Sequence, residues 1–432
     1  MKKITTLWGL CLLSLWGSAA LAQTASLPEL VQVALNRAPQ IREAQANWQA
    51  AQQDVAQSQG ALWPKLELNA NSAAAKVDSS AAHALTGRVG ATVSYNLWDF
   101  GRIRSQIEAR ESQANALADK FKLARETTAN DTVNTYLQLV KQQRSIRVYQ
   151  QHIIELTALV NKLSEIVEVF AGRRSELTQA QTRLGQAEDA LVALQARQRE
   201  YQLVLMRLVG PDAGAALSAG ALPEFAKADA ALLVSQASQN HPSLRAALNE
   251  AAAAQAQLAE AQAAQKPEVD VVLSKQSGRD VYGVAAPAQL YVTARWVAFD
   301  GHSSAANQLA LLARAQAAQE RAETLRQELD YKIQSAGADA QAQAKRAHAL
   351  MGLVASTDQV RKDYYDQWRE LGRRSLLDVL SAESEHLSTR INLVNSEVDQ
   401  QVALARMRFE AGQLADWLLD NPATRAAEPV AH

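Results

Sequence analysis

The sequence is poor in the residues that would support disulfide cross-linking or thiol chemistry. Of its 432 residues only one is a cysteine, Cys11, and only 5% are aromatic. Cys11 lies in an N-terminal apolar segment that we expect to be removed, which would leave no thiol for a disulfide, a nucleophile, a metal site or a lipid anchor. With 44 Lys and Arg against 45 Asp and Glu, the chain also lacks the positive excess that is typical of nucleic-acid binders.

Long apolar segments are also scarce, and the N-terminal one has the features of a secretory signal. Two lysines precede an apolar run over residues 4–15, and Ala20 and Ala22 provide the small residues of a cleavage site before Gln23. We therefore predict a signal peptide over residues 1–22. No later segment approaches the ~20 continuous apolar residues that a membrane-spanning helix requires, so we expect any membrane insertion to use strands.

Motifs for catalysis, nucleotide binding and metal binding are absent from the sequence. No GxxxxGK loop and no GxSxG turn occurs, and the seven histidines are scattered without HExxH spacing. Asp99 and Asp300 recur at equivalent places, but we expect them to cap helix N-termini and not to form a catalytic carboxylate pair. The sequence therefore predicts no enzyme, no catalytic residue, no cofactor and no metal site.

What the sequence does contain is a long tandem repeat. Pro39 and Pro242 are 203 residues apart, as are Pro64 and Pro267. The motif NLWDFGR is followed 201 residues later by the related VAFDGH, and GRRS recurs after 200 residues. Four ordered landmarks at nearly constant spacing indicate a duplication. The predicted parts are a first repeat over 23–210, a linker over 211–227, a second repeat over 228–420 and a C-terminal tail over 421–432.

Stretches without proline predict very long helices in both repeats. No proline occurs over residues 65–210 or 288–421, and no glycine occurs over 103–170. Because an interior proline costs a helix about 3 kcal/mol, these stretches favour uninterrupted helices. A helix over 103–170 would be about 100 Å long at the usual rise per residue.

Each long helix is expected to turn back on itself into a second helix. Gly172 and Gly372 lie at the expected turns. Apolar residues in the last turns before Gly172 follow helical spacing, and we expect one buried stripe running from Leu156 to Phe170. The expected returning helices cover residues 175–208 and 375–417.

Alternation of apolar and polar residues before each long helix predicts membrane strands. The alternation is strict over residues 88–97, as expected of a strand with one face toward lipid. We predict β-hairpins at about 64–99 and about 267–300. Eight of the 23 aromatic residues fall in windows 62–100 and 266–300, as interfacial girdles require. Soluble hairpins that cap coiled coils are the alternative.

The predicted fold is mainly α with a small membrane β part. Its protomer consists of long antiparallel coiled-coil helices and four strands. Four strands are too few to close a barrel, since the smallest membrane barrels have about eight. Open strand edges are not tolerated in lipid, so several chains would share one barrel, and two, three or four protomers all satisfy this requirement.

Together these features resemble the TolC family of outer-membrane channels over nearly the whole mature chain. The specific motifs are NLWDFGR, VAFDGH and LGRRSLLDVLSAE, the last over residues 371–383. The resemblance implies a homotrimer in which a twelve-stranded barrel continues into an α-helical tunnel, closed at its periplasmic tip. It also implies a location in the lipid of a Gram-negative outer membrane.

The expected helical tips, residues 165–184 and 358–380, most resemble the outer-membrane components of type I secretion systems, especially those that export large adhesins. The resemblance implies a tripartite system with a periplasmic adaptor, or membrane fusion, protein and an inner-membrane ABC transporter. The alternative is the outer-membrane factor of a small-molecule or drug efflux pump, served by an RND-type transporter. A weaker alternative is a soluble periplasmic coiled-coil scaffold.

The resemblance also implies roles for residues at the tips. Arg374 matches an arginine that helps to hold the closed aperture, and Asp378 matches an aspartate of a constricting acidic ring. Other gate aspartates of the family fall on Ser381 and Thr178, which depart from the pattern, so Glu176 is the nearby candidate partner of Arg374. An ordinary solvated pair is the alternative for Arg374 and Asp378. The positions that adaptor proteins grip match Gly172, Arg173, Gly372 and Arg373.

Overall fold

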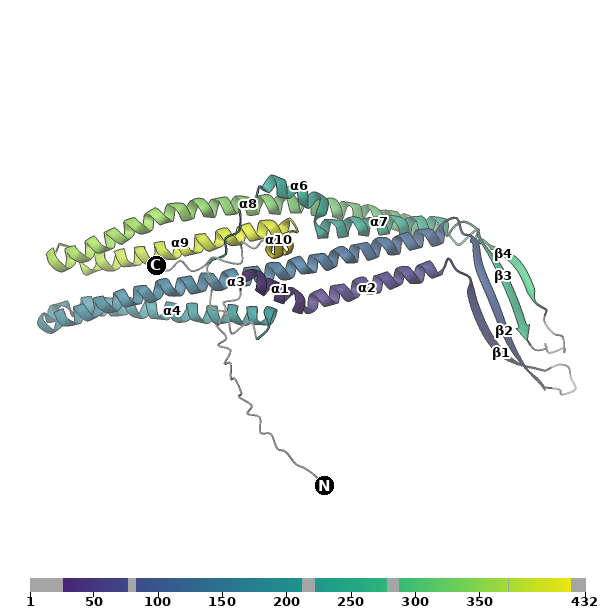
Figure 1. The fold of residues 1–432 in the computed structure, drawn as a ribbon, viewed down its shortest axis with the longest axis horizontal. Helices are drawn as coiled ribbons and strands as arrows, with labels where there is room; N and C mark the ends of the chain where they lie inside the picture. Colours follow the sequence, from purple (N-terminus) through teal and green to yellow (C-terminus); the bar gives the residue numbers. More distant parts are fainter. Residues whose placement is uncertain (1–25, 77–82, 212–221, 278–286, 372, 421–432) are drawn as a thin grey trace, which may run out of the picture.

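In the computed structural model, long helices run parallel to the long axis of the molecule and a β-sheet lies at one end (Figure 1). The structure describes residues 26–76, 83–211, 222–277, 287–371 and 373–420. The expected signal peptide, most of the expected linker, Gly372 and the expected C-terminal tail lie outside the described residues.

The two halves of the chain present their elements in the same order. The first half contains α1 (Leu27–Arg37), α2 (Pro39–Gly60), β1 (Lys65–Lys76), β2 (His83–Trp98), α3 (Arg102–Val169), the 3-10 turn η1 (Ala171–Arg173) and α4 (Arg174–Val209). The second half contains α6 (Ala230–Asn240), α7 (Pro242–Ala263), β3 (Glu268–Ser277), β4 (Gln289–Arg295), α8 (Ser303–Leu371), α9 (Leu376–Glu410) and α10 (Leu414–Asp420). The protein is therefore mostly helical, with a single small sheet among the described residues.

The long helices α3 and α8 have 68 and 69 residues and start directly after the sheet. Gly101 and Gly301 have φ angles of 87° and 69°, a left-handed conformation that glycine adopts without steric cost. Asp99 and Asp300 each accept a hydrogen bond from a backbone N–H of the first helical turn, at 2.7 and 2.8 Å. Both aspartates therefore cap the N-terminus of a long helix, as the sequence predicted. No helix in the described part of the chain has the length and apolarity needed to cross a membrane.

The returning helix of the second half, α9, is shorter than the sequence predicted. The expected helix continued to Trp417, but α9 ends before Gly412, whose φ is 70°. A Cβ at Gly412 would lie 2.7 Å from Pro242 Cδ, so the chain turns here where a larger residue would clash. The turn leads into α10. The Leu414 N–H in the first turn of α10 has no partner within that helix and donates to Glu126 of α3 at 2.9 Å.

The four strands form one antiparallel sheet in the order β1-β2-β3-β4, so the two hairpins are joined through β2 and β3. The β2–β3 register pairs Val93 with Leu273 and shifts between Asn96 and Trp98. The expected apolar face is solvent-exposed in the single chain, with exposed fractions of 60% for Val89 and 72% for Leu290. The strands β1 and β4 form the two edges of the sheet.

Buried apolar side chains form two separate clusters along the helices. The middle core lies where α1, α6 and α10 pack on the long helices, and Leu137, Leu205 and Ile333 are fully buried there. The tip core lies between the helices near their turns and includes Leu163 and Trp368. The stripe expected at the end of α3 stops before the turn, because Phe170 is 66% exposed.

Candidate functional site

The two helical turns lie together at the end of the molecule opposite the sheet (Figure 1). Gly172 is exposed within η1, and a Cβ added there would meet no atom within 4 Å. Arg373 is also exposed, and its backbone N–H donates to the Gln367 carbonyl at 3.2 Å. Both positions, which the sequence analysis assigned to adaptor contact, are therefore accessible in the single chain.

Arg173 joins the first turn to the second helical hairpin. Its guanidinium forms an ion pair with Glu176, with Nη2 2.9 Å from Oε2. The same guanidinium lies 5.5 Å from the ring centre of Trp368 in α8, within the range of a cation–π contact. Glu176 therefore pairs with Arg173 of its own turn, whereas the sequence analysis had named it as the candidate partner of Arg374.

Arg374 is held by the end of α8. Its guanidinium lies 4.2 Å from the ring centre of Tyr364, and its Nε donates to Gln367 Oε1 at 3.3 Å. No ion pair joins Arg374 to Glu176 or to Asp378 within the described part of the chain. An aromatic ring and an amide thus hold this arginine inside one protomer.

Asp378 caps the helix to which it belongs. Its Oδ2 accepts hydrogen bonds from the Ser375 N–H at 3.1 Å and from the Ser375 hydroxyl at 3.0 Å. In return the Asp378 N–H donates to Ser375 Oγ at 3.2 Å, which completes a capping box at the start of α9. The hydrogen bonds from Ser375, with a smaller effect of the nearby Arg374 charge, lower the pKa of Asp378. The carboxylate therefore stays ionised at neutral pH.

Aromatic residues also organise the tips, although they are not among the residues predicted from the sequence motifs. Tyr365 and Trp368 lie with ring centres 5.8 Å apart, and Arg369 lies 5.8 Å from the Tyr365 ring centre. The signal was present in the segment DYYDQWRE, where aromatic and cationic residues recur three and four positions apart on a helix. At the other turn, Val169 is 74% exposed and adds an apolar surface next to Phe170.

The tip contacts of Arg173, Arg374 and Asp378 are individually weak. The ion pair and cation–π contacts of Arg173 and Arg374 are of a kind worth about 1 kcal/mol or less at an exposed site, and a helix cap such as that of Asp378 is typically worth about 1 kcal/mol. A partner protein that binds the tips could replace such contacts one at a time. Of these contacts, the one between Arg173 and Trp368 joins the two hairpins, whereas those of Arg374 and Asp378 lie within the second hairpin.

Comparison with known proteins identifies relatives that cover most of the chain. The family model described as "Outer membrane efflux protein" matches residues 30–211 and 233–413. Outer membrane efflux protein BepC of Brucella suis biovar 1 (strain 1330) is 25% identical over 417 residues, which cover 93% of this chain and 88% of BepC. The two matched segments correspond to the two halves of the fold.

Solved structures show the same fold at lower sequence identity. The outer membrane protein VceC of Vibrio cholerae superposes with a TM-score of 0.81 at 20% identity, covering 90% of this chain and 96% of VceC. The open state of the outer membrane channel MtrE of Neisseria gonorrhoeae superposes with a TM-score of 0.77 at 18% identity, covering 90% of this chain and 89% of MtrE.

Proposed function

Since the chain belongs to the outer membrane efflux protein family, whose members are TolC-like channels of the Gram-negative outer membrane and not enzymes, we propose that it forms the outer-membrane tunnel of a tripartite type I secretion system. The observation that carries the channel function is the four-stranded sheet with an exposed apolar face, continuous with two long helical hairpins. The outer-membrane location of the family excludes the soluble periplasmic scaffold.

The tunnel is proposed to be a homotrimer. The free edges β1 and β4 carry backbone groups that need partners in lipid. Joining β4 of one protomer to β1 of the next would pair every edge, and three protomers would give a twelve-stranded barrel. The exposed Val89 and Leu290 would then face lipid, and the long helices would continue the barrel as a tunnel into the periplasm.

The proposed cargo is protein, such as a large adhesin, delivered by an inner-membrane ABC transporter through a periplasmic adaptor. The support is the resemblance of the two tip segments to type I secretion components. The second candidate is export of small molecules or drugs with an RND-type transporter, and the name of the relative BepC as an efflux protein favours it.

The tips are proposed to hold the gate and the adaptor site. In the trimer, three copies of Asp378 would form an acidic ring at the tunnel axis, and Arg374 would help to keep it narrow. Arg173, which pairs with Glu176, also contacts the ring of Trp368, and this supports a further contact that keeps the two hairpins together in the closed gate. Gly172, Arg173, Gly372 and Arg373 are proposed as adaptor contacts. The two family matches also support the proposed division into two repeats.

Two measurements test the proposal at separate levels. Purified protein reconstituted in planar bilayers should conduct ions, and an absence of conductance would contradict the channel. Deleting the gene should abolish release or surface display of a large protein and leave drug susceptibility nearly unchanged. A several-fold increase in drug susceptibility with normal protein secretion would instead support the efflux function.

A further inference from the structure

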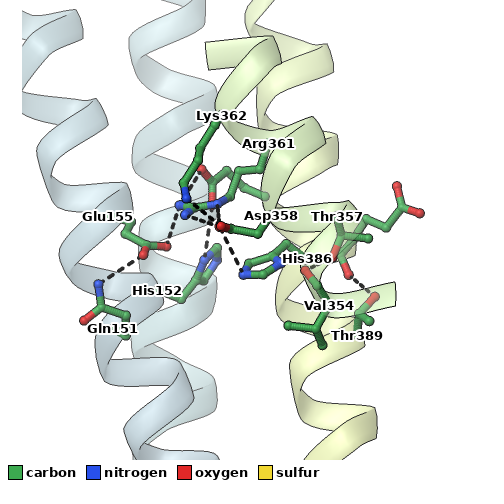
Figure 2. A network of polar contacts seen from close by, with 12 residues as sticks. Gln151, His152, Glu155, Val354, Thr357, Asp358, Arg361, Lys362, His386 and Thr389 are labelled. Carbon is green, nitrogen blue, oxygen red and sulfur yellow. Dashed lines mark hydrogen bonds and ion pairs between the residues drawn. The ribbon is translucent and has the colours of Figure 1, made fainter. Parts of the chain in front are cut away.

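A polar cluster with a buried centre lies between the two helical hairpins, beside the tip core (Figure 2). We call it the interhairpin cluster, and its members come from three helices. They are His152 and Glu155 of α3, Asp358 and Arg361 of α8, and Glu383 and His386 of α9. The proposed gate and adaptor contacts do not use these residues.

The spacing of the cluster residues repeats on two facing helices. His152 and Glu155 are three positions apart on α3, and Glu383 and His386 are three positions apart on α9. A histidine and a carboxylate at this spacing lie on one helix face, one turn apart. Helices in the cores of some metal-binding bundles carry a glutamate and a histidine at this spacing in the order Glu-x-x-His, which α9 has and α3 has in reverse.

The centre of the cluster contains a carboxylate oxygen without a partner. His152 and Glu383 are each only 7% exposed. Glu383 Oε2 is buried and has no hydrogen-bond partner among the described residues. It faces His152 Nδ1 across 3.9 Å, which is too long for a hydrogen bond. A buried carboxylate oxygen left unpaired costs free energy, so a cation or a proton is expected at this position.

We propose that His152, Glu155 and Glu383 bind one divalent transition-metal ion, with Zn²⁺ as the preferred ion. One ligand atom from each residue lies within 4.8 Å of the others. Two ligand atoms bound to one tetrahedral zinc ion lie about 3.3 Å apart, given bonds of about 2 Å. Small rotations of the side chains would therefore bring all three atoms to bonding distance.

The neighbouring Arg361 contacts both carboxylates but does not bind the unpartnered oxygen of Glu383. Its Nη1 lies 3.0 Å from Glu155 Oε2 and 3.4 Å from Glu383 Oε1, whereas the free oxygen of Glu383 is Oε2. Asp358 holds Arg361 on its own helix, with Nη2 2.7 Å from Oδ1. Arg361 would thus bind the outer oxygens of the ligating carboxylates, as outer partners do in many metal sites. Glu155 Oε1 accepts a hydrogen bond from Gln151 Nε2 at 3.0 Å, and its second lone pair would face the ion.

The donor set favours a transition metal over calcium or magnesium. Imidazole nitrogen suits zinc and cobalt, whereas calcium and magnesium select sites built from oxygen alone. Three protein ligands would leave the fourth position of a tetrahedral zinc ion to water. A cavity of about 150 Å³ beside the cluster, lined by Tyr149, His152, Arg183 and Glu383, would admit that water.

Bound metal would tie α3 to α9 and so join the first hairpin to the second. The two hairpins meet near the tips through the tip core and this cluster, so the ion would oppose their separation. This inference does not depend on whether the cargo is protein or a small molecule.

The test uses the full mature protein in detergent, stripped of metal by a chelator and dialysed against Zn²⁺. We expect one zinc ion per chain in the wild type. Glu383→Gln, His152→Gln and Glu155→Gln should each weaken binding by roughly 10- to 100-fold or more, since loss of outer partners alone has that effect. The exposed Glu385→Gln on α9 and His348→Gln on α8 are matched controls that should bind as the wild type does.

Cobalt and thermal unfolding provide independent readouts. Co²⁺ should give the absorption bands of a tetrahedral site in the wild type and lose them in His152→Gln. Zinc should raise the melting temperature of the wild type but not of Glu383→Gln. Glu155 is only partly buried, so Glu155→Gln tests the site if Glu383→Gln does not fold. Equal zinc binding by the wild type, the ligand variants and the controls, or no binding by the wild type, would overturn the proposal.

Discussion

The middle core and the tip core are enclosed by different kinds of contact. In the middle core, the short helices α1, α6 and α10 cover the long helices and bury large apolar side chains, among them Leu30, Leu137, Leu414 and Leu418. The tip core has no such covering helices among the described residues and is smaller. Its boundary is formed by cation–π contacts, a capping box and the interhairpin cluster.

The difference shows which part of the molecule can move at low cost. Apolar burial stabilises by about 25 cal/mol per Å² and is lost only when the core opens to water. Exposed polar contacts contribute about 1 kcal/mol or less each and can be exchanged for contacts with a partner. We therefore expect the hairpins to shift at their tips more readily than the middle core opens.

The largest expected effect is in the middle core. Leu205→Ala in α4 removes a side chain that is fully buried, and we expect it to lower the free energy of unfolding by about 2 to 5 kcal/mol. The matched control is Leu203→Ala, because Leu203 lies two residues away on the same helix and is 66% exposed. This substitution should change the free energy of unfolding by about 0.5 kcal/mol or less. Denaturation followed by helical circular dichroism measures both. Equal losses would mean that the two faces of α4 are equally buried in the assembled protein.

The second prediction concerns Glu126, which joins α3 to α10 within the middle core. Burial raises its pKa to about 7, although the hydrogen bonds from Leu414 and Ala415 act against the shift. The folded protein binds the proton of the Glu126 carboxyl group more tightly than the unfolded chain does. The stabilising effect of this proton on the folded state is therefore complete below the ordinary pKa of a glutamate. It is lost as the pH rises through about 7.

Glu126→Gln removes this titration. The wild type should lose stability relative to the variant between pH 5 and pH 8, by an amount on the order of 3 kcal/mol, since each unit of pKa shift corresponds to about 1.4 kcal/mol. Glu320→Gln, at an exposed position of α8, should leave the pH dependence unchanged. Melting temperatures measured across this pH range test the prediction. A parallel shift of the wild type and Glu126→Gln would contradict it.

The sequence predicted the long elements well, because local signals define them. The helix expected over 103–170 is α3, Arg102–Val169, since a proline-free and glycine-free stretch between a capping aspartate and a glycine leaves little freedom. The strand β2, His83–Trp98, follows in the same way from the strict alternation over residues 88–97. The resemblance to TolC-like channels is confirmed by the family match.

The sequence could not predict features that depend on distant residues. The end of α9 depends on Pro242 packing against Gly412, and α10 depends on Glu126, which is 288 residues from Leu414 in the chain. The contact between Arg173 and Trp368 likewise joins two hairpins, and no local pattern indicates it. The interhairpin cluster was missed because its histidines and carboxylates form a group only when α3 and α9 pack together.

The third prediction separates two roles of Asp378 at the start of α9. Ser375→Ala removes the capping hydroxyl and should destabilise this helix end by about 1 kcal/mol, but it keeps the carboxylate and so the proposed cation preference of the channel. Asp378→Asn removes the charge and should lower the cation preference and the affinity for blocking multivalent cations. Reversal potentials in planar bilayers measure the preference. If both variants keep the wild-type preference, Asp378 does not line the constriction.

The smallest expected effect concerns the contact between Arg374 and Tyr364. A cation–π contact at an exposed site is worth about 0.5 to 1 kcal/mol, so losing it should shift the closed tip only partly toward opening. Arg374→Ser and Tyr364→Leu should each raise the mean single-channel conductance. Tyr364→Phe keeps the ring, and Arg373→Ser changes a neighbouring arginine at the surface, so both should behave as the wild type does. If Tyr364→Phe opens the channel as much as Tyr364→Leu, the hydroxyl and not the ring holds the tip. If neither Arg374→Ser nor Tyr364→Leu changes the conductance, the constriction lies elsewhere, because an arginine that held the gate only through this ring could not be removed without effect.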